Sequence, residues 1–294
     1  MEAAVVERLR RDSSVELHPR LVHASLLYDE LGRRKLQMVY QSYIDTAQEA
    51  GLPLLICTPT WRANRDRVYE SDIDRDVNFD AVHFMNTLRD MQGAARSAIK
   101  IGGLIGCKND CYRPEEGLSP GESEESHSWQ ISQLAQAGVD FLIAETLPNI
   151  HEAIGITKAM AVTGVPYVIS FVINRGGCLL DGTPLWKAVN ILDRAVDNQP
   201  LGFMVNCAHP TFLGAARQRR RLFARLIGYQ ANASSSNHTH LDGLSQLEVD
   251  DVSQWGDEML ILNRKYGVKV LGGCCGTGSD HLKYLVINRS LTKS

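Results

Sequence analysis

The stretch Val270-Leu-Gly-Gly-Cys-Cys-Gly-Thr277 places two adjacent cysteines among three glycines. An apolar run at residues 268–271 leads into it, and a segment with helical spacing at residues 279–291 follows it. We therefore expect a buried strand, a turn and a helix in succession. Both cysteines then lie at the carboxyl end of the strand.

This pair of cysteines is a candidate metal site. Neighbouring residues of a regular strand point to opposite faces, so Cys274 and Cys275 converge only on an irregular backbone. Gly272, Gly273 and Gly276 permit the backbone angles that such a turn demands. Two thiolates favour zinc, with a third ligand from elsewhere in the chain. The alternative is a buried pair without a metal, because free cysteine is commonly buried.

Outward from this stretch, short apolar runs alternate with longer helical segments. The expected strands are residues 54–57, 100–106, 139–144, 165–172, 201–205, 225–229 and 268–271, with a first strand somewhere between residues 14 and 27. The expected helices are residues 35–50, 79–98, 124–137, 150–162, 184–196, 249–265 and 279–291. This alternation predicts a parallel sheet, and eight strands favour a closed (β/α)8 TIM barrel over an open sheet. No linker of biased composition interrupts residues 1–294, so we expect one domain.

The composition narrows the class of protein. The chain has 294 residues, 44% of them hydrophobic and 22% charged, which is ordinary for a globular protein. A net charge of −3 argues against a nucleic-acid or membrane-surface binder. No apolar run approaches the roughly 20 residues of a membrane span, and the N-terminus lacks a signal-peptide core. Seven cysteines, an odd number with two adjacent, argue against a disulfide framework and favour a reduced, cytoplasmic setting.

The strand ends supply the third metal ligand. In a (β/α)8 barrel the chemistry gathers where strands end at their carboxyl termini. Cys207 follows the strand expected at residues 201–205, so it lies on the same rim as Cys274 and Cys275. Three thiolates without an obvious fourth protein ligand match a catalytic zinc with an open position better than a closed structural one.

Four segments carry a family resemblance. They are Thr58-Pro-Thr-Trp-Arg-Ala-Asn64, Ala144-Glu-Thr-Leu-Pro-Asn149, Val205-Asn-Cys207 and Gly272-Gly-Cys-Cys-Gly-Thr277. In this order they resemble the motifs of the homocysteine S-methyltransferase family, which includes betaine–homocysteine and S-methylmethionine–homocysteine methyltransferases. The resemblance covers the chain from about residue 35 onward. It implies the (β/α)8 fold and zinc held by Cys207, Cys274 and Cys275.

The same resemblance implies an activity and a set of binding residues. The expected enzyme is a zinc-dependent S-methyltransferase that moves a methyl group from a sulfonium, quaternary ammonium or methylated cofactor to a small thiol. Homocysteine is the implied acceptor and methionine the product, a reaction of methionine biosynthesis. Thr58, Asn64, Glu145 and Asn206 are expected to bind substrate, with Glu145 contacting the amino group of the thiol. Trp61, in a rim loop, is a candidate for holding a cationic donor over its ring, with ordinary packing as the alternative.

One part of the sequence departs from the family pattern. The family's first strand usually ends in an Asp-Gly signature that also helps to hold the homocysteine amino group. Residues 15–24 contain no Asp-Gly pair, and Glu16 is the nearest carboxylate. Residues 214–248 match no family motif except around residues 229–233. A thiol other than homocysteine therefore stays open as the acceptor.

Two other functions remain as alternatives. A zinc barrel could activate water for hydrolysis, but such hydrolases usually bind zinc through histidine and carboxylate, and three cysteines match them poorly. A non-catalytic barrel could keep the fold and the zinc as a binding module, and the missing Asp-Gly supports this alternative. The expected partners are small molecules, with no nucleic acid and no membrane, and the sequence does not set the oligomeric state.

Overall fold

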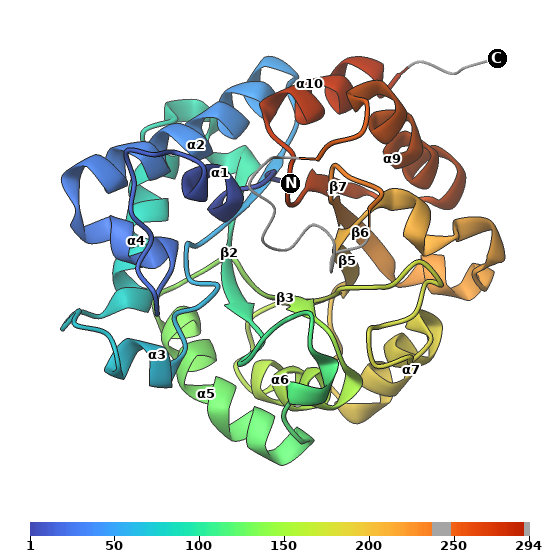
Figure 1. Cartoon of the computed structure of the whole chain (residues 1–294), viewed down its shortest axis with the longest axis horizontal. Helices are drawn as coiled ribbons and strands as arrows, with labels where there is room; N and C mark the ends of the chain where they lie inside the picture. Colours follow the sequence, from blue (N-terminus) through green and yellow to red (C-terminus); the bar gives the residue numbers. More distant parts are fainter. Residues whose placement is uncertain (237–247, 291–294) are drawn as a thin grey trace.

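A parallel sheet curls around the centre of the molecule in the computed structural model, which describes residues 1–236 and 248–290 (Figure 1). Its seven strands lie side by side in sequence order. They are β1 (Leu54–Cys57), β2 (Ile99–Gly106), β3 (Phe141–Leu147), β4 (Tyr167–Phe171), β5 (Gly202–Ala208), β6 (Leu226–Ala231) and β7 (Val270–Gly273). Each of the seven expected strands after the first is present within a few residues of its predicted bounds. The TIM-barrel class is confirmed as a curled half-barrel of seven parallel strands in a single domain.

Most helices cover the outside of the sheet, while the short helix near the N-terminus lies inside this ring (Figure 1). The helices are α1 (Val6–Arg10), α2 (Glu30–Glu49), α3 (Arg65–Tyr69), α4 (Val77–Asp90), α5 (Pro120–Gln136), α6 (Ile150–Ala161), α7 (Leu185–Ala195), α9 (Val252–Tyr266) and α10 (Ser279–Asn288). Short 3-10 turns occupy part of the connections. The helix expected over residues 79–98 ends early, at Asp90, and residues 93–98 form a separate 3-10 helix that begins at Gly93, whose φ is +57°.

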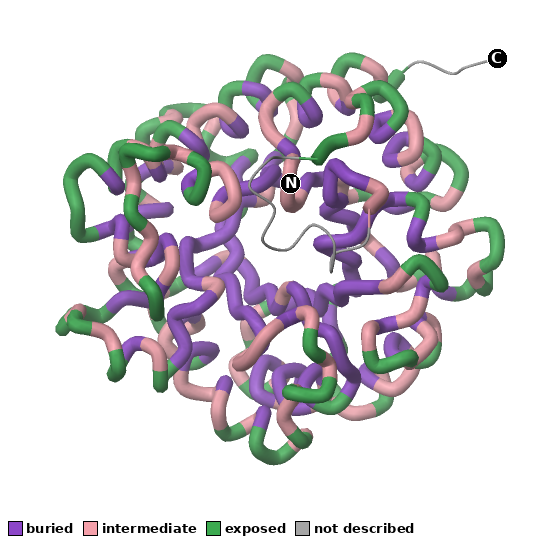
Figure 2. Tube along the Cα trace, in the orientation of Figure 1, coloured by how far each residue is buried: buried purple, intermediate pink, exposed green. Residues whose placement is uncertain are grey.

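The strands are buried on both faces, as their continuous apolar runs predict. Every residue of β4 and β5 is buried, and the central strands form the most buried part of the trace in Figure 2. One large apolar cluster joins the sheet to the surrounding helices. A smaller cluster, which includes Leu104, Phe141 and Met204, gathers strand side chains apart from that layer. The sheet is therefore a rigid scaffold that holds the strand ends in fixed positions.

The expected first strand between residues 14 and 27 is wrong. In that stretch His18 and Val22 form an isolated antiparallel bridge, and residues 23–28 form a 3-10 helix. The imidazole Nδ1 of His18 accepts hydrogen bonds from the backbone N–H of Arg20 (3.0 Å) and Leu21 (3.1 Å). This local turn leaves no extended segment there to pair with the sheet.

The start of the chain takes the place of that strand. The terminal amino group of Met1 donates to the carbonyl of Leu271 (2.8 Å), in β7. The N–H of Glu2 donates to Leu55 in β1 (3.0 Å), and the Glu2 carbonyl accepts from Gly273 in β7 (3.0 Å). Residues 1–2 thus connect the two edges of the half-barrel through backbone hydrogen bonds.

Two further sequence features can be placed. Of residues 214–248, those at 215–217 and 220–224 form 3-10 turns, residues 226–231 form β6, and residues 237–247 lie outside the described part of the chain. No helix in residues 1–236 or 248–290 is long and apolar enough to cross a membrane.

Candidate metal and substrate site

Three cysteine thiols meet at the carboxyl ends of β5 and β7. Cys207 is the sixth residue of β5, and Cys274 and Cys275 follow β7 directly. The three Sγ atoms all lie within 4.8 Å of one another, with Cys207 buried and the other two partly buried. The predicted convergence of these side chains on one point is thus present in the fold. Three thiolates in this arrangement can act together as ligands of one metal ion.

Irregular backbone produces the convergence. Cys207 has a φ of +52°, and the β5–β6 register shifts between Asn206 and Ala208. After β7, Gly276 has a φ of +80°, which favours glycine. We expected Gly273 to be needed for its backbone angle, but its role in the structure is to leave space for Thr277. A Cβ added at Gly273 would lie 2.1 Å from Oγ1 of Thr277. Close packing, as well as backbone freedom, therefore shapes this turn.

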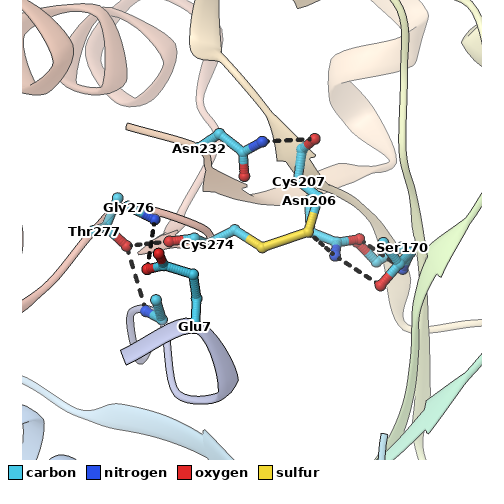
Figure 3. Close-up of a disulfide and its surroundings, with 10 residues drawn as sticks. Glu7, Ser170, Asn206, Cys207, Asn232, Cys274, Gly276 and Thr277 are labelled. Carbon is cyan, nitrogen blue, oxygen red and sulfur yellow. Dashed lines mark hydrogen bonds between the residues drawn. A yellow bond between two sulfur atoms is a disulfide. The ribbon is translucent and has the colours of Figure 1, made fainter. Parts of the chain in front are cut away.

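Two of the thiols are joined in this structure. Cys207 and Cys274 form a disulfide, with their Cα atoms 5.4 Å apart, and Cys275 is free (Figure 3). The sequence argued against a disulfide framework, and this single pair joins two of the three expected metal ligands while Cys57, Cys107, Cys111, Cys178 and Cys275 are free. The cause is proximity, since a Cα separation of this size is ordinary for disulfides. Because a disulfide sulfur cannot act as a thiolate ligand, metal binding by all three cysteines requires the reduced protein.

A polar network fixes the position of Cys207 (Figure 3). The Asn206 side-chain oxygen accepts from the N–H of Thr146 (2.9 Å) and from the Ser170 hydroxyl (2.7 Å). Its amide nitrogen lies 3.4 Å from Sγ of Cys207. Asn232 donates to the Cys207 carbonyl (3.1 Å). Residues of β3, β4 and β5 and the residue that follows β6 therefore hold Cys207 in place.

Among the carboxylates that line a cavity of about 1060 Å³ together with the thiols, Glu2 and Glu145 stand out by their burial. Oε1 of Glu145, near the end of β3, is shielded from solvent without a hydrogen-bond partner in the described part of the chain. Burial raises the pKa of Glu145 to about 8. Glu2 is 6% exposed, and its Oε2 accepts from the N–H of Cys57 (2.8 Å). Burial, and then the charge of Glu145, raise the pKa of Glu2. A cation bound between Glu2 and Glu145 would offset their desolvation and their mutual repulsion, and would lower the pKa of both.

The structure separates the other expected binding residues into two groups. Asn206 and Trp61 line the cavity with Glu145 and the cysteines. Thr58, Asn64 and Glu16 do not border it. The Thr58 hydroxyl lies 2.7 Å from that of Thr60 and accepts from the N–H of Leu104 (3.0 Å), entirely buried.

Asn64 and Glu16 have other surroundings. The Asn64 side chain caps α3 by accepting from the N–H of Arg67 (3.1 Å). Glu16 is exposed on the surface, away from the cavity. These two residues and Thr58 therefore fall outside the site that we describe.

Several cavity residues were not found from the sequence. Glu2 was overlooked although the apolar run at residues 3–6 beside it was a visible signal for a strand-like position. Arg62 and Arg67 also line the cavity. Arg62 stands inside one of the motif segments, but nothing in its spacing reveals that its guanidinium lies 4.2 Å over the ring of Trp61.

Comparisons with known proteins agree with this geometry. The sequence model of the family described as homocysteine S-methyltransferase matches residues 2–287. Homocysteine S-methyltransferase 2 of Zea mays is 28% identical over 175 residues, covering 57% of this chain and 49% of that protein. Homocysteine S-methyltransferase of Escherichia coli K12 is 28% identical over 177 residues, covering 56% of this chain and 53% of that protein. The chain thus spans about half the length of the curated relatives it matches.

Solved structures show the same fold. The homocysteine methyltransferase MmuM of Escherichia coli in its metallated form superposes with a TM-score of 0.76 at 19% identity, covering 98% of this chain and 95% of that one. Its oxidized form gives a TM-score of 0.76 at 20% identity, covering 98% and 94%. At such identities the likeness concerns the arrangement of the barrel alone.

Proposed function

Because this chain belongs to the homocysteine S-methyltransferase family, we propose that it transfers a methyl group from a cationic donor to the sulfur of homocysteine. We further propose that Cys207, Cys274 and Cys275 hold a zinc ion for this reaction. The observation that carries the proposal is the meeting of three thiols within 4.8 Å, in a cavity that also contains Glu2 and Glu145.

The donor set fits zinc in the reduced protein. Thiolates are soft ligands, and three of them leave the fourth tetrahedral position open to a substrate. When bound, zinc supplies a Lewis acid that keeps the acceptor thiol deprotonated and nucleophilic at neutral pH. The chain itself fixes the ligands, since Asn232 holds the carbonyl of Cys207 and Thr277 holds that of Cys274 (2.6 Å).

The two carboxylates suit the ammonium group of the acceptor. Glu145 has a buried oxygen without a partner, and Glu2 lies close enough for the two charges to repel. An ammonium group between them would restore the ionised form of both and gain charge-assisted hydrogen bonds. Glu2 then supplies the second carboxylate for which the sequence suggested Glu16. Fixing the amino end also orients the sulfur toward the donor.

Beyond the zinc ligands and the residues that bind the substrates, methyl transfer requires no further catalytic side chain. The acceptor thiol loses its proton to bulk water before the transfer, and its sulfur then forms a bond to the donor methyl carbon. The bond between that carbon and the donor's positive sulfur or nitrogen breaks, and the leaving atom keeps the electron pair and becomes neutral. No general acid is required, because the leaving group departs without a negative charge. The tasks of the chain are therefore to bind, orient and desolvate the two substrates.

A hydrolytic function has less support. In residues 1–236 and 248–290 the one grouping of three metal-ligating side chains consists of thiols. Zinc hydrolases usually rely on histidine and carboxylate ligands with a carboxylate to take a proton from water. The methyl-transfer assay distinguishes an enzyme from a non-catalytic zinc-binding barrel, because the latter would bind zinc without transferring a methyl group.

Methyl transfer to homocysteine should be measured with reduced, zinc-loaded protein and a panel of donors that includes S-methylmethionine and glycine betaine. We expect transfer from at least one donor, its loss on chelation, and its return with zinc. Cys275→Ser should lose both zinc and activity. The matched control Cys178→Ser should keep both, because Cys178 is a half-exposed thiol outside the cluster. Full activity in the metal-free protein would refute the zinc mechanism, and zinc binding without transfer from any donor would refute the enzyme.

A further inference from the structure

The short helix α1 lies inside the ring that most of the other helices form around the sheet (Figure 1). The residues of this region that line the thiol cavity are Val6, Glu7, Arg10 and Arg11. The methyl transfer proposed above gives no task to this helix. Its position beside the cysteines therefore needs an explanation of its own.

Two hydrogen bonds join the N-terminal segment to the cysteine turn (residues 273–277). The N–H of Ala4 donates to Oγ1 of Thr277 (3.3 Å). The N–H of Gly276 donates to Oε2 of Glu7 (3.2 Å), and Figure 3 shows this carboxylate directed at the turn. The first bond uses a backbone group that almost any residue would supply, whereas the second depends on the carboxylate at position 7.

The carboxylate of Glu7 is held in a fixed position. Its side chain is 14% exposed and forms an ion pair with Arg11, one helical turn further along the chain. The carboxylate thus has two partners, the guanidinium of Arg11 and the N–H of Gly276. Hydrogen bonds to an ionised acceptor are stronger than those between neutral groups. Because Arg11 balances its charge, Glu7 adds little net negative charge beside the thiols.

Glu7 and Ala233 fix the peptide group between Cys275 and Gly276. The carbonyl of Cys275 accepts from the N–H of Ala233 (2.9 Å), and the N–H of Gly276 donates to Glu7. A peptide group is planar and includes the Cα atoms on both sides, so its orientation sets the direction in which the Cys275 side chain leaves the backbone. Since Gly276 has a φ of +80°, regular secondary structure does not hold this peptide, and the two hydrogen bonds take that role.

The other two cysteines are held by different groups. The N–H of Cys274 donates to the carbonyl of Ala231 in β6 (2.8 Å), and the Cys274 carbonyl accepts from the Thr277 hydroxyl (2.6 Å). Cys207 lies within β5, in the polar network shown in Figure 3. The bond from α1 to the cysteine turn therefore bears on the third cysteine, Cys275.

We propose that Glu7 is a positioning residue of the metal site. Its carboxylate fixes the peptide group after Cys275, so that the Cys275 thiolate points toward the other two thiolates before zinc binds. Side chains that orient metal ligands in this way typically contribute about ten- to hundredfold to metal affinity. The inference rests on the zinc site of the proposed function and names a side chain outside the ligand set on which that site depends.

The test compares two substitutions of similar size, of which only one keeps a hydrogen-bond acceptor. Glu7→Gln retains an oxygen that can accept from the N–H of Gly276, and Glu7→Met does not. The zinc dissociation constant of the reduced protein is measured by competition with a chromophoric chelator. Glu7→Met should weaken zinc binding about ten- to hundredfold, and Glu7→Gln should recover most of this loss.

Arg8→Met is the matched control, because it places the same side chain on the same helix. Arg8 does not border the cavity and donates to the hydroxyls of Ser42 (3.2 Å) and Tyr43 (3.0 Å) in α2. The zinc affinity of Arg8→Met should stay within about twofold of wild type. Thermal unfolding of the metal-free proteins identifies a variant that fails to fold, and Glu7→Ala then takes the place of Glu7→Met.

A second measurement identifies which ligand loses its protection. Protein in excess zinc is treated briefly with iodoacetamide, and the modified cysteine of the singly labelled product is located by mass spectrometry. In wild type the three ligands should all react slowly, whereas in Glu7→Met the first of them to react should be Cys275. A general loosening of the fold would expose Cys207 and Cys274 as well.

Zinc binding by Glu7→Met as tight as that of wild type would overturn the inference. Equal losses in Glu7→Met and Glu7→Gln, or in Glu7→Met and Arg8→Met, would also overturn it, as would first modification at Cys207 or Cys274. If wild type binds no zinc, the zinc site of the proposed function fails together with this inference. Zinc binding by wild type that is insensitive to residue 7 overturns the inference alone.

Discussion

Replacing Glu145 with glutamine is expected to weaken homocysteine binding about ten- to hundredfold while the zinc content stays unchanged. The substitution keeps the shape of the side chain and removes its charge. The buried Oε1 of Glu145 has no other partner among the described residues, so the bond to the substrate ammonium is what the change removes. A charge-assisted hydrogen bond contributes about 1.5–3 kcal/mol, which corresponds to the stated loss in affinity.

The assay compares two acceptors in wild type and variant. Homocysteine carries the ammonium group, and 4-mercaptobutyrate has the same thiol and carboxylate without it. The variant should raise the Michaelis constant for homocysteine and leave that for 4-mercaptobutyrate within about twofold. Equal effects on both thiols, or none on homocysteine, would show that Glu145 does not hold the amino group.

Three further outcomes are expected. Because the folded pKa of Glu145, about 8, is above its ordinary value of 4.5, wild type should lose stability as pH rises from about 5 to 8, on the order of 3–4 kcal/mol. The Glu145→Gln variant should lack this part of the pH dependence in denaturant melts. Gly276→Ala should lower the free energy of unfolding by about 1–2 kcal/mol, since φ is +80° there, whereas Gly278→Ala, with open space around its Cβ and no positive φ, should be nearly neutral. Glu2→Gln should weaken homocysteine by a factor similar to that of Glu145→Gln, and an unchanged Michaelis constant would remove Glu2 from the site.

The sequence predicted the strands well because their signal is local. Residues 54–57 and 201–205 are continuous apolar runs, and both are found in buried strands of the sheet. The first strand could not be predicted in the same way. Residues 15–24 contain apolar positions, but hydrogen bonds to the His18 ring fold that stretch into a turn. Which segment pairs with β1 and β7 depends on contacts with residues more than 50 positions away.

The site was predictable where strand ends could be read from the sequence. Cys207 and the Cys274–Cys275 pair each follow an apolar run, so their meeting on one rim follows from the barrel. The disulfide between two of them was missed, because it depends on a distance and on oxidation state. Arg62 was missed because its burial results from the loop at residues 107–109 folding over it.

X-ray absorption at the zinc edge, with and without homocysteine, tests the central claim most directly. Reduced, zinc-loaded protein should show three sulfur ligands from Cys207, Cys274 and Cys275 and one lighter ligand. Addition of homocysteine should replace that lighter ligand with a fourth sulfur, and 4-mercaptobutyrate should do so only at higher concentration. A coordination shell that stays unchanged when homocysteine saturates an active enzyme would contradict the account.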